Sequence, residues 1–273
     1  MRIDTYQARA SAYKELLATI TPGVAGEMYE KLTAGIYSRV LRHGDVSLDG
    51  GANAGRHTIG MANAVGPNGH VFAFEPSTAA LPILKRNLAE AGVAQWVTLH
   101  EVALGESEGS ASFCVLHGAL GMSGLQLREL DDQLKAKVRV ENIVVRVTKL
   151  DSLIPSTTPV RFIKLDVEGG EYHAMVGGVG LISAQRPVIV FENGRGHSAA
   201  DYKYTEDDFF GFFDSVNYSL YDALGFPFTR DQWTMGSVPW QYIALPKESG
   251  PHLQLVFDEI RPQLQAHALR TSD

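Results

Sequence analysis

The chain has 273 residues, of which 45% are hydrophobic and 20% charged, with a net charge of -7. This composition is typical of a globular protein with a sizeable core, and its acidic balance argues against nucleic acid or anionic membranes as partners. The single cysteine, Cys114, excludes a disulfide within the chain and a cysteine-based metal site. The sequence shows neither a signal-peptide core nor a run of 18 apolar residues, so we expect a cytoplasmic protein without a membrane span.

The spacing of the apolar residues predicts two helices, over residues 8–20 and 26–41. After residue 43 this helical spacing gives way to an alternation of strands and helices. The elements predicted after them are, in chain order, a strand at 46–49, a helix at 58–65, a strand at 71–74, a helix at 79–91, a strand at 97–100, an antiparallel excursion over 110–116 and 138–147, a strand at 160–165, a helix at 170–176, a strand at 187–191, a helix at 209–216, and a closing antiparallel pair at 219–221 and 241–244. This alternation predicts a doubly wound α/β fold with a mostly parallel, seven-stranded sheet. We expect three segments: an N-terminal helical extension (1–43), a main domain (44–249), and a C-terminal helix and tail (250–273).

A glycine-rich turn follows the first predicted strand, in the run Leu48–Gly55. Ligands of open parallel sheets bind beyond such strand ends, where Gly51 and Gly55 let the backbone turn and approach closely. Dinucleotide folds need G-x-G-x-x-G here, but Asn53 holds the second glycine position. The carboxylate of Asp49 would repel a diphosphate and suits a cation instead. The turn therefore points to S-adenosylmethionine, which carries a sulfonium and an ammonium group.

The ends of the next two predicted strands offer binding groups for the ribose and the adenine ring of such a ligand. Glu75 ends the second strand, 24 residues after Gly51, where an acid can accept hydrogen bonds from both ribose hydroxyls. A nicotinamide cofactor would use the same acid, so Glu75 alone does not separate the two cofactors. The third end, around Ala103, offers an apolar edge and backbone groups to an adenine ring.

A second acidic motif, Ile163–Glu171, ends the fourth strand of the parallel sheet. Asp166 and Glu168 alternate along an extended chain, so we expect both on one side of the site. Three uses remain open for this carboxylate pair: it can hold the methionine ammonium group, accept a proton, or ligate a divalent metal ion.

Taken together, these motifs resemble the FkbM family of S-adenosylmethionine-dependent methyltransferases over roughly residues 44–193. The matching segments are 49–55, 72–76, 102–105, 147–151, 163–171 and 187–192. The resemblance implies a class I methyltransferase fold, with O-methylation of a hydroxyl on a sugar, glycan or polyketide-like molecule. It also implies that cofactor-binding residues lie at the first strand ends and that Asp166 and Glu168 lie at the reaction centre. The cofactor-binding residues that the resemblance implies are Asp49, Gly51, Asn53 and Glu75, and the predicted set also includes Gly55, Ala103 and Asp166.

The group that takes a proton from the acceptor is open. His197 follows the fifth strand end in a glycine-flanked loop and is our first candidate, with His57 and His173 as rivals. Alternatively, Asp166, Glu192 and Asn193 can supply oxygen ligands to Mg²⁺ or a similar ion.

Three functions remain open at this point: O-methylation of a small or carbohydrate-like acceptor, methylation of nitrogen or another nucleophile, and cofactor binding without methyl transfer. A nicotinamide oxidoreductase belongs to the last group, and Asp49 argues against it. The flanks 1–43 and 194–273 match the family weakly, so we expect them to select the acceptor. The sequence leaves open whether the chain forms a homo-oligomer.

Overall fold

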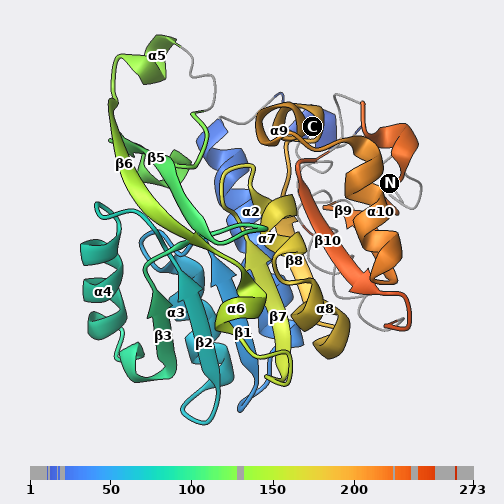
Figure 1. The fold of residues 1–273 in the computed structure, drawn as a ribbon, viewed down its shortest axis with the longest axis horizontal. Coiled ribbons are helices and arrows are strands. Elements are labelled where there is room, and N and C mark those ends of the chain that lie inside the picture. The colour runs from blue at the N-terminus through green and yellow to red at the C-terminus, as the bar shows by residue number, and fades with distance from the viewer. Residues whose placement is uncertain are drawn as a thin grey trace, which may run out of the picture.

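The computed structural model describes residues 11, 13–16, 18, 22–127, 132–223, 225–234, 239–249 and 262. A seven-stranded sheet with the order β3-β2-β1-β7-β8-β10-β9 forms its centre (Figure 1). The strands are β1 (Val46–Gly50), β2 (His70–Phe74), β3 (Val97–His100), β7 (Val160–Leu165), β8 (Val188–Glu192), β9 (Tyr218–Asp222) and β10 (Gln241–Pro246). β1, β2, β3, β7 and β8 run parallel, so their carboxyl ends meet along one edge of the sheet.

The antiparallel end of the sheet is made by the last strand of the chain. β10 lies between β8 and β9 and is antiparallel to both, with Ile243 opposite Val190 on one side and Tyr221 on the other. The side chains of β10 alternate between two cores, because successive residues of a strand face opposite sides of the sheet. Gln241, its first residue, pairs with Glu192, the last residue of β8. The amino end of β10 therefore lies beside the carboxyl end of β8.

Helices cover both faces of the sheet. The helices are α2 (Pro22–Val40), α3 (Arg56–Val65), α4 (Leu81–Glu90), α6 (Leu150–Leu153), α7 (Glu171–Val176), α8 (Val179–Gln185), α9 (Gly196–Tyr202) and α10 (Glu206–Ser215), with 3-10 turns η1 (Ala94–Trp96) and η3 (Arg230–Gln232). α2, α3 and α4 bury their apolar sides in one core, and α7, α8 and α10 bury theirs in the other. The central strands are apolar on both sides, as expected for a sheet that helices cover twice.

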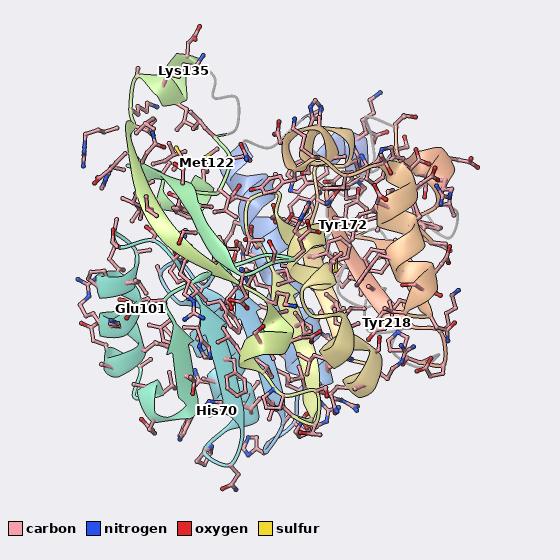
Figure 2. All side chains as sticks on the ribbon, in the orientation of Figure 1. His70, Glu101, Met122, Lys135, Tyr172 and Tyr218 are labelled. Atoms are coloured by element: carbon pink, nitrogen blue, oxygen red, sulfur yellow. The ribbon has the colours of Figure 1, made fainter. Side chains whose placement is uncertain are left out.

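A second, three-stranded sheet rises beyond the strand ends. It has the order β4-β6-β5 and consists of β4 (Ala103–Leu104), β5 (Gly109–His117) and β6 (Arg139–Thr148), with η2 (Leu120–Met122) and α5 (Asp132–Lys135) between the long strands. Figure 2 shows Lys135 at its far tip and Met122 nearer the main sheet, whereas His70 lies at the opposite end of the molecule. The projection therefore lies at the end of the sheet where the parallel strands finish.

These observations confirm the predicted doubly wound, mostly parallel seven-stranded sheet, the antiparallel excursion and the closing antiparallel pair. The helix expected over 26–41 begins earlier, at Pro22, because proline suits the first turn of a helix. Of the helix predicted over 8–20, residues 11, 13–16 and 18 are described and are helical, whereas residue 262 alone is described in the predicted C-terminal segment; the segment boundaries at 43 and 250 remain predictions. In the described part of the chain, no helix combines the length and the apolar character needed to cross a membrane.

Candidate functional site

Three neighbouring hollows lie where the parallel strands end. We call the first the tip pocket, because the ends of β1, β2 and β7 form its floor and the second sheet covers it. Its lining residues are Gly51, Asn53, Phe74, Glu75, Pro76, Val102, Ala103, Leu104, Phe113, Leu120, Gly121, Ser123, Leu125, Asp166, Val167, Glu168 and Gly170. The lining brings together five of the residues that the sequence predicts for cofactor binding, which are Gly51, Asn53, Glu75, Ala103 and Asp166.

The first strand end needs glycine for a steric reason. Gly51 has a φ of +80°, and a Cβ atom at this position would lie 1.8 Å from the carbonyl oxygen of Asp166. No side chain fits there, because the ends of β1 and β7 approach each other so closely. Gly51 therefore lets the tip pocket form with both acidic motifs around it.

Glu75 is fixed in the tip pocket by backbone donors. Its Oε2 accepts a hydrogen bond from the N–H of Asn53 at 2.7 Å, and its Oε1 accepts one from the N–H of Ser77 at 2.8 Å. Each carboxylate oxygen has two lone pairs, so both can still accept from a ribose hydroxyl. Burial raises the pKa of Glu75 above its ordinary value, against the lowering effect of the two backbone hydrogen bonds. The geometry thus agrees with the predicted bidentate contact to a ribose.

The remaining wall of the tip pocket is apolar. Val102, Ala103 and Leu104 form one side, Phe113 comes from β5 of the second sheet, and Leu120 comes from η2. Such a slot is suited to a flat aromatic base. The sequence motifs indicated Ala103 but not Phe113 or Leu120. The alternation of residues 110–116 indicated a strand, yet no local signal placed that strand over the pocket.

Asp49 does not line the tip pocket, which corrects the prediction that its carboxylate faces the ligand cation. Its Oδ2 accepts a hydrogen bond from Thr58 Oγ1 at 2.6 Å, and its Oδ1 lies 3.4 Å from Lys164 Nζ. The partner cation is therefore a side chain of the protein. Gly55 does not line the pocket either; it precedes α3 with a φ of +91°, where a Cβ atom would lie 2.7 Å from Leu84.

Lys164 joins the two acidic motifs, and the sequence analysis did not single it out. Its Nζ donates to the carbonyl oxygen of Gly51 at 3.1 Å and lies 3.5 Å from Asp166 Oδ2, besides its contact with Asp49. Burial lowers the pKa of Lys164, but the carboxylates outweigh this effect and raise it above its usual value. A lysine within the buried run Phe162–Leu165 of β7 is the signal that could have identified it.

The loop after β7 is held in a defined shape. Glu168 has a φ of +60°, which is rare for a residue with a side chain, and its carbonyl oxygen accepts a hydrogen bond from Tyr202 Oη at 3.1 Å. Glu171 Oε1 accepts hydrogen bonds from the N–H groups of Val167 and Gly169. Burial raises the pKa of Glu171 to about 7. Glu171 thus braces the loop that carries Asp166 and Glu168.

The second and third hollows adjoin the tip pocket. The inner cavity lies under α2 and is lined by Tyr29, Glu30, Thr33, His57, Lys164, Leu165, Asp166, Val190, Phe191, Glu192 and Gln241. The outer groove has a volume of about 940 Å³ and is lined by Leu127, Lys135, Val140, Glu168, Gly169, Glu192, Asn193, Gly194, Arg195, His197, Ser198, Asp201, Tyr202 and Trp240. The inner cavity is therefore lined mainly by residues of α2, α3, β7, β8 and β10, whereas the outer groove is lined mainly by α9 and the loops that follow β7 and β8.

Three carboxylates link these hollows in pairs. Asp166 lines the tip pocket and the inner cavity, Glu168 lines the tip pocket and the outer groove, and Glu192 lines the inner cavity and the outer groove. A group bound in any one hollow is therefore adjacent to two of these acids. The expectation that Asp166 and Glu168 lie together beside the cofactor site agrees with this arrangement.

The three candidate histidines lie in different places. His197 is exposed in the first turn of α9 and lines the outer groove, but neither the tip pocket nor the inner cavity. His57 is buried, lines the inner cavity and pairs with Glu30 at 2.6 Å between Nε2 and Oε2. The ring nitrogens of His173 contact the carbonyl oxygen of Tyr202 at 2.9 Å and the carboxylate of Glu106 at 3.3 Å. Both ring nitrogens of His173 thus contact groups of the protein, whereas His57 and His197 each line one of the hollows.

Asn193, one of the three possible metal ligands, is engaged within the protein at both ends of its amide. Asn193 Nδ2 donates to Tyr204 Oη at 2.8 Å, and Asn193 Oδ1 accepts from the N–H of Arg195 at 2.7 Å. Asn193 therefore fixes the start of α9 with both ends of its amide. Within the described ranges, no three His, Cys, Asp or Glu side chains gather in a way that could hold a metal ion.

The tip pocket fits an adenosyl group with an attached cation. Glu75 offers two acceptors at one end, the apolar slot offers room for the base, and Asp166 and Glu168 place negative charge at the other end. A diphosphate would meet these acids and would find no G-x-G-x-x-G turn. The chemistry of the lining therefore favours S-adenosylmethionine over a nicotinamide dinucleotide.

Comparisons with known proteins found similarity to one family and to several solved structures. The family model described as the methyltransferase FkbM domain matches residues 49–220. A solved FkbM methyltransferase from Methylobacillus flagellatus is 17% identical with a TM-score of 0.46, over 86% of this chain and 58% of that one. The O-methyltransferase TomG from Streptomyces achromogenes, solved with S-adenosylmethionine, is 18% identical with a TM-score of 0.43, over 88% of both chains.

A third solved structure, a putative rRNA methylase from Clostridium thermocellum, is 14% identical with a TM-score of 0.46, over 84% of this chain and 97% of that one. A comparison with curated proteins found no match. This chain thus spans only 58% of the length of the Methylobacillus FkbM structure. The family match extends from Asp49 at the end of β1 to Leu220 in β9, and it includes both acidic motifs. The chain therefore belongs to the FkbM-domain family of S-adenosylmethionine-dependent methyltransferases.

Proposed function

We propose that the protein methylates a hydroxyl group of a small or carbohydrate-like acceptor. The observation that carries this proposal is the pairwise sharing of Asp166, Glu168 and Glu192 among the tip pocket, inner cavity and outer groove. An acceptor in either of the last two hollows lies against the end of the tip pocket where these acids gather. The acids can accept hydrogen bonds from hydroxyl groups and can receive a proton.

The protein's part in the reaction is alignment and proton transfer. When bound, S-adenosylmethionine supplies an electrophilic methyl group, which the acceptor oxygen displaces in line from sulfur. Glu75 and the apolar slot fix the adenosyl end, and the loop braced by Glu171 fixes the acids at the other end. As the oxygen–carbon bond forms and the carbon–sulfur bond breaks, the hydroxyl proton must pass to a base.

We assign this proton to the carboxylate of Asp166. Aliphatic hydroxyls are very weak acids, so they need a positioned base as the new bond forms. Asp166 lines the tip pocket, and the ion pair with Lys164 at 3.5 Å holds its carboxylate in place. His197 remains a second candidate because its side chain lines the outer groove.

The outer groove has the size and the lining for the body of the acceptor. Its volume of about 940 Å³ falls in the range of pockets that bind small molecules. Trp240, which is 41% exposed, and Tyr202 offer aromatic surfaces, while Asp201 and Arg195 offer hydrogen-bonding groups. Aromatic faces combined with polar side chains suit a carbohydrate-like or other hydroxylated molecule.

The direct test is methyl transfer from isotopically labelled S-adenosylmethionine to a panel of sugars, polyols, hydroxylated polyketides and amines. We expect labelled methyl ethers, identified by mass spectrometry, and their loss in the Asp166→Asn variant. Transfer to amines alone would replace the proposal with N-methylation. Binding of S-adenosylhomocysteine without transfer to any member would point to a protein that binds the cofactor only.

A further inference from the structure

Two side chains that line the inner cavity carry buried polar atoms without a partner among the described residues. Gln241 is 5% exposed and Tyr29 is 2% exposed, and within the part of the chain that the structure describes neither Gln241 Oε1 nor Tyr29 Oη has a hydrogen-bond partner. The amide of Gln241 is oriented, because its Nε2 donates to Thr33 Oγ1 at 2.5 Å. Buried polar groups are almost always satisfied, so these two atoms call for an explanation.

The size and charge of the inner cavity limit which chemical groups can form hydrogen bonds with Gln241 Oε1 and Tyr29 Oη. Its volume of about 10 Å³ is the room that one water-sized group needs. Three carboxylates line it, those of Glu30, Asp166 and Glu192, whereas Lys164 is the cation that pairs with Asp166. Such a cavity disfavours an anion and accepts hydrogen bonds from a donor. A hydroxyl group meets both conditions, because it is small, neutral and able to donate.

The position of the cavity connects it to both other hollows. Asp166 separates it from the tip pocket, and Glu192 separates it from the outer groove. Tyr29 also packs against Trp240, with ring centroids 5.0 Å apart, so the walls of the cavity and the groove are in contact. A molecule seated in the groove can therefore extend one group past Glu192 into the cavity.

We propose that the inner cavity is the subsite for the acceptor's reacting hydroxyl, so the methyl group is delivered toward α2 and β10 and away from the outer groove. The hydroxyl donates its single hydrogen bond to Gln241 Oε1 when it binds and turns it to the Asp166 carboxylate as reaction begins. The oxygen–carbon bond then forms as the carbon–sulfur bond breaks, the thioether leaves, and the proton passes to Asp166. The group of the acceptor that enters this subsite is thereby selected by Gln241, Tyr29 and Thr33. This inference rests on the proposed function, because it requires S-adenosylmethionine in the tip pocket.

The direction of transfer can be measured without knowing the acceptor. In sinefungin, a carbon bearing an ammonium group replaces the methylated sulfonium, so this analogue places a cation where the methyl group is delivered. The ratio of its dissociation constant to that of S-adenosylhomocysteine, from calorimetry, reports the charge next to that position. Gln241→Glu adds a carboxylate to the inner cavity and should improve the ratio in favour of sinefungin about tenfold. Affinity for S-adenosylhomocysteine should change less than about twofold.

The matched control adds the same charge to the outer groove. His197→Glu should leave the ratio within about twofold of the wild type, because His197 lines the groove and not the cavity. An improved ratio in His197→Glu without one in Gln241→Glu would overturn the inference and direct the methyl group into the groove. An unchanged ratio in both variants would also overturn it.

A second variant guards against misfolding of Gln241→Glu. Tyr29→Phe removes one oxygen atom from the cavity wall and keeps the aromatic packing against Trp240. It should weaken sinefungin several-fold relative to S-adenosylhomocysteine, and an unchanged ratio would contradict the subsite. Failure of the wild type to bind S-adenosylhomocysteine would instead reject the cofactor site and with it the proposed function.

Discussion

Lys164 and Asp49 form an ion pair inside the protein, with 3.4 Å between Nζ and Oδ1. Both side chains are buried, and the same ammonium group contacts Asp166 and the carbonyl oxygen of Gly51. One cation therefore holds the ends of β1 and β7 together. It also compensates two carboxylates that would otherwise repel each other.

Replacing Lys164 by methionine should destabilise the fold. The change keeps most of the side-chain volume but leaves Asp49 and Asp166 without their shared cation, and breaking a buried pair costs about 3–5 kcal/mol. Urea unfolding at pH 7 measures the loss. Lys85→Met is the matched control, because Lys85 forms an exposed pair with Glu101, and such pairs contribute roughly 0–1 kcal/mol. Equal stability of the two variants would show that the buried pair contributes little.

Replacing Glu75 by glutamine should weaken cofactor binding. The amide nitrogen of glutamine cannot accept from the N–H of Asn53 or Ser77 or from a ribose hydroxyl, so one side of the contact is lost. Charged hydrogen bonds contribute about 1.5–3 kcal/mol, so affinity for S-adenosylhomocysteine should fall about tenfold or more in calorimetry. Glu90→Gln, at the exposed end of α4, is the control. Retained affinity in Glu75→Gln would place the ribose elsewhere, whereas wild-type binding of NAD without S-adenosylhomocysteine would overturn the identity of the cofactor.

The pKa of Glu171 predicts how stability depends on pH. Burial raises this pKa to about 7 in the folded protein, from the ordinary value of 4.5 for a glutamate in water. The folded state therefore holds more protons than the unfolded state between these values, and stability falls as pH rises through this window. Glu171→Gln should remove this dependence. It should be more stable than the wild type at pH 8, by roughly up to 3 kcal/mol, and similar to it at pH values below the ordinary pKa of glutamate.

Urea unfolding at several pH values tests the Glu171 prediction. Glutamine can still accept hydrogen bonds from Val167 and Gly169, so the loop keeps its brace. Glu171→Ala removes those bonds as well and should be less stable than Glu171→Gln at every pH. Parallel pH profiles of the wild type and Glu171→Gln would mean that Glu171 does not titrate in this range.

Asp166 and His197 can be compared directly once an acceptor is known. Asp166→Asn should lower kcat by about 10²–10⁴, the usual range for general-base catalysis. His197→Ala should lower it by less than about fivefold, because His197 is exposed and lines the outer groove only. A large loss in His197→Ala, with the acidic limb of the kcat/KM profile gone, would restore the sequence-based assignment of His197 as the base.

Methyl transfer should not depend on a divalent metal. Asn193 is engaged by Tyr204 and Arg195, and the part of the chain that the structure describes shows no metal-binding cluster of His, Cys, Asp or Glu. Turnover after treatment with EDTA should therefore equal turnover with added Mg²⁺. Loss of activity in EDTA that Mg²⁺ restores would require a different arrangement of Asp166 and Glu192.

The sequence predicted the features that depend on local pattern. Strand period, glycine turns and the acids that follow strands identified the sheet and five residues of the tip pocket, because parallel strands bring their carboxyl ends together. Asp49 was placed in the wrong environment for a related reason. Its position near the end of β1 was correct, but its partner, Lys164, lies 115 residues later in β7.

The inner cavity depends on contacts that no local pattern encodes. Thr33 of α2 and Gln241 of β10 are 208 residues apart, and their hydrogen bond closes one wall. The tip pocket also depends on contacts between distant parts of the chain. Phe113 belongs to β5, and tertiary packing places this strand over the ends of the parallel strands. Residue types alone therefore could not show which hollow takes the methyl group.

Because β10 lies between β8 and β9, the tip pocket and the inner cavity become complete at different times during synthesis of the chain. The residues that line the tip pocket lie between positions 51 and 170, whereas those that line the inner cavity extend from 29 to 241. A growing chain thus holds every wall residue of the tip pocket some seventy residues before Gln241 is made. Since β9 is made before β10, β10 must insert between β8 and β9, so the cavity closes only when this last strand is in place.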